Sequence, residues 1–176
     1  MILLIGSLNH TTSAWQRWNR SGKNTTAGNM VLNQDFKEFI QSLNDNQVRY
    51  LVIGGYAVAL HGHPRYTKDL DLWIEHSEES AVKMIAALDQ FGFASLDLKP
   101  ADFLEPNQVI QLGYPPNRID IMTSLEGIEF ESCYESRVVV IVDNVEISFI
   151  DLDNLKKNKR ATGRFQDLAD IENLES

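Results

Sequence analysis

The spacing of apolar side chains predicts alternating helices and short strands from about residue 30 to the C-terminus. Apolar residues recur at helical spacing after Asn33, a residue type whose side chain caps helices. The same period predicts helices at residues 56–61, 78–91, 152–159 and 165–174. Gly92 is placed to end the helix at 78–91, and Gly163 separates the last two helices.

Alternating and continuous apolar runs predict strands at residues 50–53, 69–75, 109–112, 119–122, 138–142 and 145–150. The turn at residues 114–117 predicts antiparallel pairing of the strands on either side of it. Asp143-Asn144 is a typical two-residue hairpin turn. This order of elements favours an α+β domain with one mixed sheet flanked by helices.

Two predictions concern which side chains are buried. In the strand at 69–75, Leu70, Leu72 and Ile74 share one face, and Asp69, Asp71 and Trp73 share the other. Trp73 is expected to stack on a base or to pack under a C-terminal helix. In the helix at 78–91, the side chains expected to point inward are Val82, Ile85, Ala86 and Leu88.

Residues 1–29 differ in composition from the rest of the chain. They are rich in Ser, Thr, Asn and Gly and show no apolar period, which is typical of a flexible extension. The predicted organisation is therefore an extension at 1–29 and a single domain at 30–176. Met30 opens the regular pattern, so a natural start there is an equal alternative.

Composition and charge narrow the class of protein. The chain is 43% hydrophobic and 23% charged, as in ordinary globular proteins, and the single Cys133 cannot form an internal disulfide. No apolar run approaches the ~20 residues that span a bilayer, and the apolar run at residues 1–5 is too short for a signal peptide. These features predict a cytoplasmic protein without a membrane role.

The net charge of −9 argues against a general nucleic-acid coat. A local basic cluster lies near the C-terminus, and it either binds phosphate or reflects the preference of helix C-termini for cations. Its members are Lys156, Lys157, Lys159, Arg160 and Arg164.

Three acids form the strongest candidate for chemistry. Asp69 and Asp71 lie two apart on a predicted strand, so both carboxylates project from one face, where they repel each other unless a cation joins them. Asp120 is the acid of the strand at 118–122 and is the best third ligand. Three carboxylates can hold two Mg²⁺ ions, with Mn²⁺ as the alternative. Gly54-Gly55, at the end of the strand before these acids, lets the backbone approach a phosphate closely.

Taken together, these motifs resemble the signature of the DNA polymerase β-like nucleotidyltransferases. In that signature an apolar strand ends in Gly-Gly, Asp-x-Asp follows after a helical segment, and a distal Asp lies on a later strand, as in residues 51–55, 69–72 and 118–121. Residues 54–57, 61–67 and 159–164 resemble the small standalone, AbiEii-toxin-like members. The resemblance covers about Met30 to the end and implies the minimal nucleotidyltransferase fold.

The resemblance also implies roles for individual residues. Asp69 and Asp71 would bind both metal ions, and Asp120 would bind the catalytic ion and help to deprotonate the acceptor. Five residues are expected to bind the nucleotide: Gly54, Gly55, Arg65, Lys68 and Lys159. For Lys68, a solvated turn residue is the alternative. Asp167 and Asp170 are expected to anchor the tail helix to Lys159 or Arg164, and a solvated charge is the alternative for Asp167.

The sequence therefore predicts a Mg²⁺-dependent nucleotidyltransferase that moves an NMP from an NTP to a hydroxyl or phosphate acceptor. The acceptor class is left open among tRNA, protein and small molecules. A partner protein in a toxin–antitoxin pair is a further expectation. The alternative is a catalytically inactive nucleotide-binding or interaction module with the same fold.

Overall fold

A computed structural model describes residues 25–27, 30–115 and 117–175. Its centre is a six-stranded sheet with the order β5-β6-β4-β3-β8-β7, and β1 and β2 form a separate two-stranded sheet. The strands are β1 (Thr25–Ala27), β2 (Met30–Leu32), β3 (Tyr50–Val52), β4 (Asp69–Ile74), β5 (Val109–Leu112), β6 (Arg118–Met122), β7 (Val138–Val142) and β8 (Val145–Phe149). The sheet is mixed and flanked by helices, which confirms the predicted α+β class.

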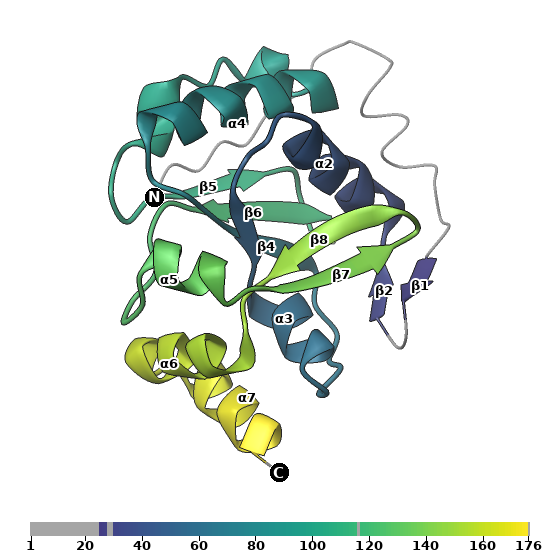
Figure 1. The fold of residues 1–176 in the computed structure, drawn as a ribbon, viewed down its shortest axis with the longest axis vertical. Coiled ribbons are helices and arrows are strands. Elements are labelled where there is room, and N and C mark those ends of the chain that lie inside the picture. The colour runs from purple at the N-terminus through teal and green to yellow at the C-terminus, as the bar shows by residue number, and fades with distance from the viewer. Residues whose placement is uncertain (1–24, 28–29, 116, 176) are drawn as a thin grey trace.

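The helices follow the predicted order, with additions. They are α2 (Gln34–Asp45), α3 (Gly54–Leu60), α4 (Glu78–Phe91), α5 (Phe130–Glu135), α6 (Leu152–Thr162) and α7 (Phe165–Glu175), with 3-10 turns at Ala94–Leu96 and Pro100–Phe103. α2 and α4 lie together at one end of the molecule, and α6 and α7 lie together at the other, where the chain ends (Figure 1). Within the described residues, no helix is long and apolar enough to cross a membrane.

Both predicted antiparallel pairs are confirmed: β5 with β6 and β7 with β8. Asp143 and Asn144 turn the second pair with φ values of 49° and 65°, the left-handed conformations that a two-residue hairpin turn needs. The sequence pattern did not predict the parallel pairs, β4 with β6 and β3 with β8. The β4–β6 pair is the one that positions the site.

Local signals explain why α2 forms where it does. The side chain of Asn33 accepts a hydrogen bond of 2.8 Å from the backbone N–H of Phe36, as the N-cap prediction required. The apolar face of the helix, including Phe39, Ile40 and Leu43, is 0% exposed. Ser42 Oγ donates to the carbonyl of Ala87 in α4 over 2.5 Å, so a buried hydrogen bond joins the two helices.

Two burial predictions were wrong. In α4 the buried residues are Ser80, Ala81, Met84, Ala87 and Leu88, whereas Val82 is 59% exposed. The prediction was right for Leu88, but Ala86 is exposed and Ile85 only half-buried, so the inward stripe is rotated from the predicted one towards Ala81 and Met84.

Trp73 is 3% exposed and is not available to stack on a base. Its ring lies edge-to-face with Phe130, 5.0 Å between centroids. Phe130 opens α5, a helix that the sequence pattern missed. The tryptophan therefore packs against α5, where a C-terminal helix was expected.

The described part of the N-terminal segment is short. Thr25–Ala27 pairs antiparallel with Met30–Leu32, so a strand lies inside the predicted extension. Most of residues 1–29 fall outside the described residues, and the boundary at Met30 stays a prediction.

Candidate metal centre

The parallel pairing of β4 and β6 brings the three candidate acids together. The register places Asp71 opposite Asp120 and Asp69 opposite Arg118. One carboxylate oxygen from each of Asp69, Asp71 and Asp120 lies within 4.8 Å of the others. The predicted convergence of the three acids is thus confirmed, while their individual roles stay predictions.

The glycine pair creates the space that Asp71 occupies. Gly54 has a φ of 60°, and a Cβ built there would lie 2.0 Å from Asp71 Oδ2. A Cβ on Gly55 would lie 2.8 Å from the side chain of Thr67. The backbone N–H of Gly55 donates to the carboxylate of Asp71. Both positions therefore require glycine for the site to close, a role that adds to the predicted phosphate contact.

Arg118 is a site residue that the sequence reading missed. Its Nε donates to Asp120 Oδ1 over 2.6 Å, and its Nη2 donates to Asp120 Oδ2 and to Asp69 Oδ2 over 2.8 Å each. The signal that would have found it is its spacing. Arg118 lies two residues before Asp120 on one strand, so both side chains share a face.

Two further polar side chains complete the hydrogen bonding of these acids. Thr67 Oγ1 donates to Asp69 Oδ1 over 2.8 Å, and Gln111 Nε2 donates to Asp120 Oδ2 over 3.2 Å. All four oxygens of Asp69 and Asp120 therefore accept a hydrogen bond, and Asp71 keeps its bond to the Gly55 backbone.

The arrangement of the three acids raises the pKa of Asp71. Burial, and then the charges of Asp69 and Asp120, raise its pKa to about 7, although the Gly55 N–H and the Arg118 charge act in the opposite direction. A raised pKa means that the ionised form is unfavourable in this environment. Binding a cation beside the three carboxylates would reverse this penalty.

These acids line a cleft of about 670 Å³, a size typical of small-ligand sites. The cleft extends from the strand acids to the C-terminal helices. Besides the acids, its lining includes Gly54, Gly55, Arg65, Thr67, Gln108, Gln111, Arg118, Asn158, Lys159, Arg164 and Asp167. Lys68 is exposed and is not among the lining residues.

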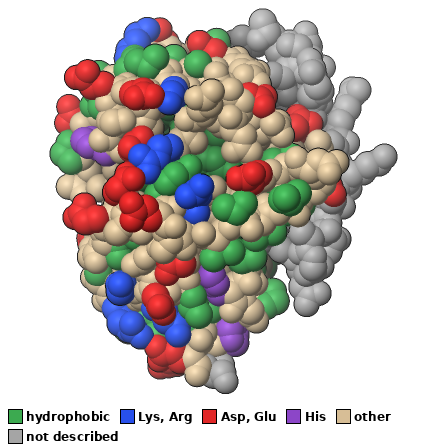
Figure 2. All heavy atoms as spheres, in the orientation of Figure 1, with side chains coloured by type: hydrophobic (Ala, Val, Ile, Leu, Met, Phe, Trp, Pro, Cys, Tyr) green, Lys and Arg blue, Asp and Glu red, His purple; other side chains and the backbone are tan. Residues whose placement is uncertain are grey.

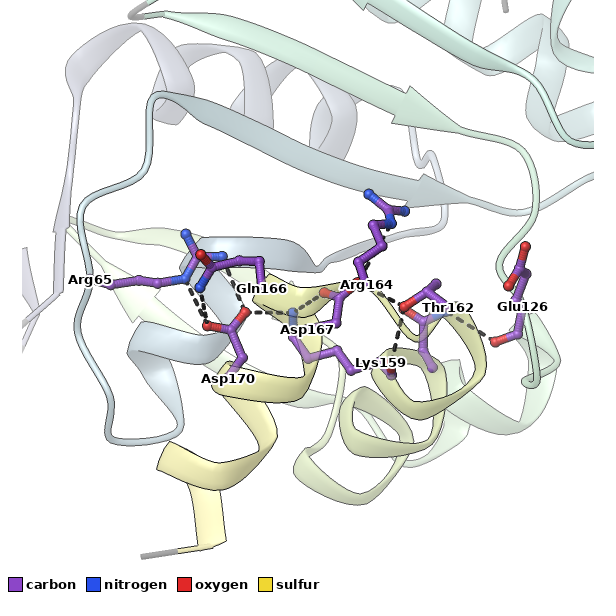
Figure 3. A network of polar contacts seen from close by, with 9 residues as sticks. Arg65, Glu126, Lys159, Thr162, Arg164, Gln166, Asp167 and Asp170 are labelled. Atoms are coloured by element: carbon purple, nitrogen blue, oxygen red, sulfur yellow. Dashed lines mark hydrogen bonds and ion pairs between the residues drawn. The ribbon is translucent and has the colours of Figure 1, made fainter.

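Three other lining residues of the cleft, Arg65, Lys159 and Asp167, belong to a network of ion pairs that joins α6, α7 and the segment after α3 (Figure 3). Lys159 is 4% exposed, and its Nζ lies 2.8 Å from Asp167 Oδ1 and 2.7 Å from Asp170 Oδ2. Arg65 Nε lies 3.0 Å from Asp170 Oδ1, and Gln166 donates to the same oxygen over 3.1 Å. The predicted anchoring of the tail helix by both acids is confirmed, so the solvated alternative for Asp167 was wrong.

Charge balance sets the pKa of Asp170. Burial acts to raise this pKa, but the hydrogen bond and charge of Lys159, with Gln166 and Arg65, outweigh burial and lower it. The remaining basic side chains of the tail are also engaged: Arg160 pairs with Glu175, and Arg164 lies 3.5 Å from Asp167. Figure 2 accordingly shows basic and acidic side chains side by side where α6 and α7 lie.

The strand acids have the chemistry of a divalent-cation site. Mg²⁺ takes oxygen ligands, which carboxylates provide. It also retains positions for water and phosphate oxygens, which an open cleft leaves accessible. Asp69, Asp71 and Asp120 are the residues that would hold such ions. The residues therefore fit the predicted metal, provided that Arg118 yields its place on Asp69 and Asp120.

Comparison with known proteins gives a family for most of the chain. Residues 30–175 match the protein family described as "Nucleotidyltransferase of unknown function (DUF6036)". None of the curated proteins matches the sequence. A similar solved structure is that of an antigenic nucleotidyltransferase-like protein from Paracoccidioides brasiliensis, with a TM-score of 0.47 and 18% identity, covering 78% of this chain and 71% of that one.

Proposed function

The chain belongs to this family of nucleotidyltransferases of unknown function, and we propose on that premise that it transfers an NMP from an NTP to an acceptor. In the reaction, an acceptor oxygen attacks the α-phosphorus and loses its proton. The bond between the α-phosphorus and the oxygen that bridges to the β-phosphate breaks, and pyrophosphate leaves.

The observation that carries the proposal is the position of three converging carboxylates on the wall of a cleft of about 670 Å³. Burial, and then repulsion by Asp69 and Asp120, raises the pKa of Asp71. A structural ion-pair network would balance its charges, whereas within the described part of the chain these three acids pair with one cation, Arg118. Such an arrangement is suited to cations that arrive with the substrate.

Mg²⁺, or Mn²⁺ in its place, supplies charge that stabilises the phosphates and favours the ionised acceptor. Asp69, Asp71 and Asp120 would hold these ions. Asp71 is fixed for that role by the Gly55 N–H and by the space that Gly54 leaves. The Thr67 hydroxyl holds Asp69 in the same way, and Gln111 holds Asp120.

The nucleotide-binding residues remain part of the proposal. Gly54 and Gly55 line the cleft and are proposed to approach the triphosphate with their backbone. Arg65 and Lys159 line the same cleft, but both are paired with Asp170, so they would contribute through the face they leave open. Lys68 would have to reach the nucleotide from outside the cleft lining.

The finer assignment rests on the sequence resemblance. We place the chain in the AbiEii-toxin-like branch, with tRNA, a protein or a small molecule as the acceptor and a toxin–antitoxin partner as a further expectation. Membership of that branch is a proposal separate from the chemistry of the site.

One observation favours a second candidate function. Arg118 already pairs with both Asp69 and Asp120, in the place that a bound ion would take. A chain in which this arginine never leaves would be a nucleotide-binding or interaction module without catalysis. The two candidate functions differ in one measurable result. Only the enzyme would transfer the labelled α-phosphate of an NTP to an acceptor.

The test is incubation with each of the four α-labelled NTPs, Mg²⁺ and cell extract. We expect one NTP to label a macromolecule or metabolite and Asp71→Asn to abolish the label. Asp89→Asn, an exposed acid of α4, serves as the matched control and should label as the wild type does. Equal labelling by wild type and Asp71→Asn, or no labelling by the wild type with any NTP, would reject the proposal.

A further inference from the structure

We infer that Arg118 is a displaceable counter-ion that makes metal binding depend on the nucleotide. In the nucleotide-free protein its guanidinium holds Asp69 and Asp120, and it moves to the phosphates when an NTP enters the cleft. The inference rests on the proposed function and assigns a positioning role to a residue of that site.

The first observation is that all four carboxylate oxygens of Asp69 and Asp120 already accept a hydrogen bond. Arg118 donates to both oxygens of Asp120 and to one oxygen of Asp69, at 2.6 to 2.8 Å. Thr67 occupies the other Asp69 oxygen, and Gln111 also bonds to Asp120. Mg²⁺ binds carboxylate oxygens directly at ~2.0–2.1 Å, so it competes with the guanidinium for the same oxygens.

Arginine cannot resolve this competition by losing its charge. A guanidinium stays protonated across the pH range in which proteins fold, and here its pKa is raised further by the hydrogen bond to Asp120. Two cations on the same oxygens also repel each other. Arg118 must therefore swing away from Asp69 and Asp120 before both carboxylates can serve metal ions.

The cleft gives Arg118 somewhere to go. Its side chain is 27% exposed and lines the same cleft as Gly54 and Gly55. Among the described residues, every ion pair that Arg118 makes is to Asp69 or Asp120, whereas Lys159 and Arg65 are paired with Asp170. Arg118 is thus the cleft cation that becomes free when metal ions take the strand acids. Its planar fork suits phosphate oxygens.

This arrangement predicts coupled binding. Without a nucleotide, the metal must displace Arg118 into water, so metal affinity is low. With an NTP, the displaced guanidinium gains a phosphate partner, and metal affinity rises. By thermodynamic linkage, removal of Arg118 raises nucleotide-free metal affinity and weakens the effect of the nucleotide.

The experiment measures Mn²⁺ binding to the full chain by electron paramagnetic resonance. Each protein is titrated without nucleotide and with a non-hydrolysable NTP analogue, against the analogue alone. For Arg118→Gln we expect nucleotide-free Mn²⁺ affinity to be about tenfold tighter than in the wild type, since charge-assisted contacts no longer compete. The gain from the analogue should shrink by a similar factor.

The controls separate a contact effect from a general charge effect. Arg164→Gln removes the same charge from the same cleft, but Arg164 is 76% exposed and pairs with Asp167, so its Mn²⁺ affinity should stay within about twofold of wild type. Arg118→Lys keeps the charge but cannot bridge two carboxylates as a fork does. It should give an intermediate affinity and provides the result if Arg118→Gln does not fold.

Three results would overturn the inference. If Arg118→Gln binds Mn²⁺ without nucleotide as weakly as the wild type or more weakly, the inference is rejected and the proposed function stands. The same holds if Arg164→Gln changes Mn²⁺ affinity as much as Arg118→Gln does. A wild-type protein that retains no Mn²⁺ beyond the analogue alone removes the proposed function, and the inference falls with it.

Discussion

Two acid–base clusters contribute residues to the lining of one cleft and differ in charge balance. The strand cluster consists of Asp69, Asp71, Asp120 and Arg118, and the tail cluster consists of Arg65, Lys159, Asp167 and Asp170. The first has three acids for one base, and the second has two of each. The pKa of Asp71 is raised to about 7, whereas the pKa of Asp170 is lowered.

The tail cluster has the charge balance of a structural ion-pair network, whereas the strand cluster has the charge imbalance of a proposed cation site. In the tail cluster every charge has a partner within the chain, so burial is compensated and the two C-terminal helices are tied together. In the strand cluster, Arg118 is the one base among the described residues that pairs with the three acids, so the proposed metal ions would supply the rest of the positive charge. Charge balance, and not the number of acids, distinguishes the two.

Asp71→Asn should give the largest effect on function. It removes one of three carboxylates that would hold the metal ions, and we expect nucleotide transfer to fall by about a thousandfold or more, equivalent to ~4 kcal/mol of transition-state stabilisation. Stability without metal should be unchanged or higher, because a repulsive charge is lost. Thermal melts in EDTA and transfer rates check both expectations. Strong destabilisation in EDTA would mean that Asp71 is a structural partner.

Asp170→Asn should behave in the opposite way. Asp170 is 1% exposed and pairs with both Lys159 and Arg65, so its loss leaves buried positive charge with less compensation. We expect the free energy of unfolding to fall by about 2–4 kcal/mol, with or without metal. Urea unfolding in EDTA and in Mg²⁺ provides the measurement. Wild-type stability in both conditions would show that the two clusters do not differ as described.

The pH dependence of stability sharpens the comparison because the two clusters act with opposite sign. The folded-state pKa of Asp71 lies above its ordinary value of 3.8, so the metal-free protein should become more stable as the pH falls from above 7 towards 4. The gain should be about 1–2 kcal/mol, since a carboxylate at the cleft surface is partly solvated. The lowered pKa of Asp170 contributes stability that is lost only below 3.8.

Unfolding of wild type and Asp71→Asn across this pH range tests the assignment. The variant should lack the rise between pH 7 and 4 and keep the loss at lower pH. A rise of the same size in both proteins would place the titrating group elsewhere.

Removal of residues 1–29 should have the smallest effect. The residues that define the two clusters lie between Arg65 and Asp170, and the family match begins at residue 30. A chain that starts at Met30 loses β1 and its pairing with β2, so we expect a change of less than about 1 kcal/mol. Calorimetry of both chains measures it. Loss of cooperative unfolding in the shorter chain would show that the segment belongs to the folded domain.

Local sequence signals predicted most elements but not their arrangement. The Asn33 cap, the Asp143-Asn144 turn and the glycine after α4 act within a few residues, so they are visible in the sequence. The parallel pairing of β4 with β6 depends on contacts between distant segments. The short helix α5 and the rotated buried face of α4 also depend on packing. Phe130 of α5 packs against Trp73 of β4, a contact between distant segments.

The site shows the same division. Asp69 and Asp71 could be identified from their spacing, and Asp120 from its position on a later strand. Arg118 has the same two-residue spacing from Asp120 that Asp69 has from Asp71, but its contact with Asp69 depends on the parallel pairing of β4 with β6. Gly54 was predicted to let the backbone approach a phosphate, and its steric role beside Asp71 could be recognised only from the structure.

The central claim is that the strand acids hold divalent cations together with an NTP, and the number of bound ions tests it without knowledge of the acceptor. Equilibrium dialysis of wild type with Mn²⁺ and each non-hydrolysable NTP analogue, against analogue alone, gives that number. We expect about two ions per chain with at least one analogue, fewer in Asp71→Asn and the same number in Asp89→Asn. Equal retention of Mn²⁺ by wild type and Asp71→Asn with every analogue would contradict it.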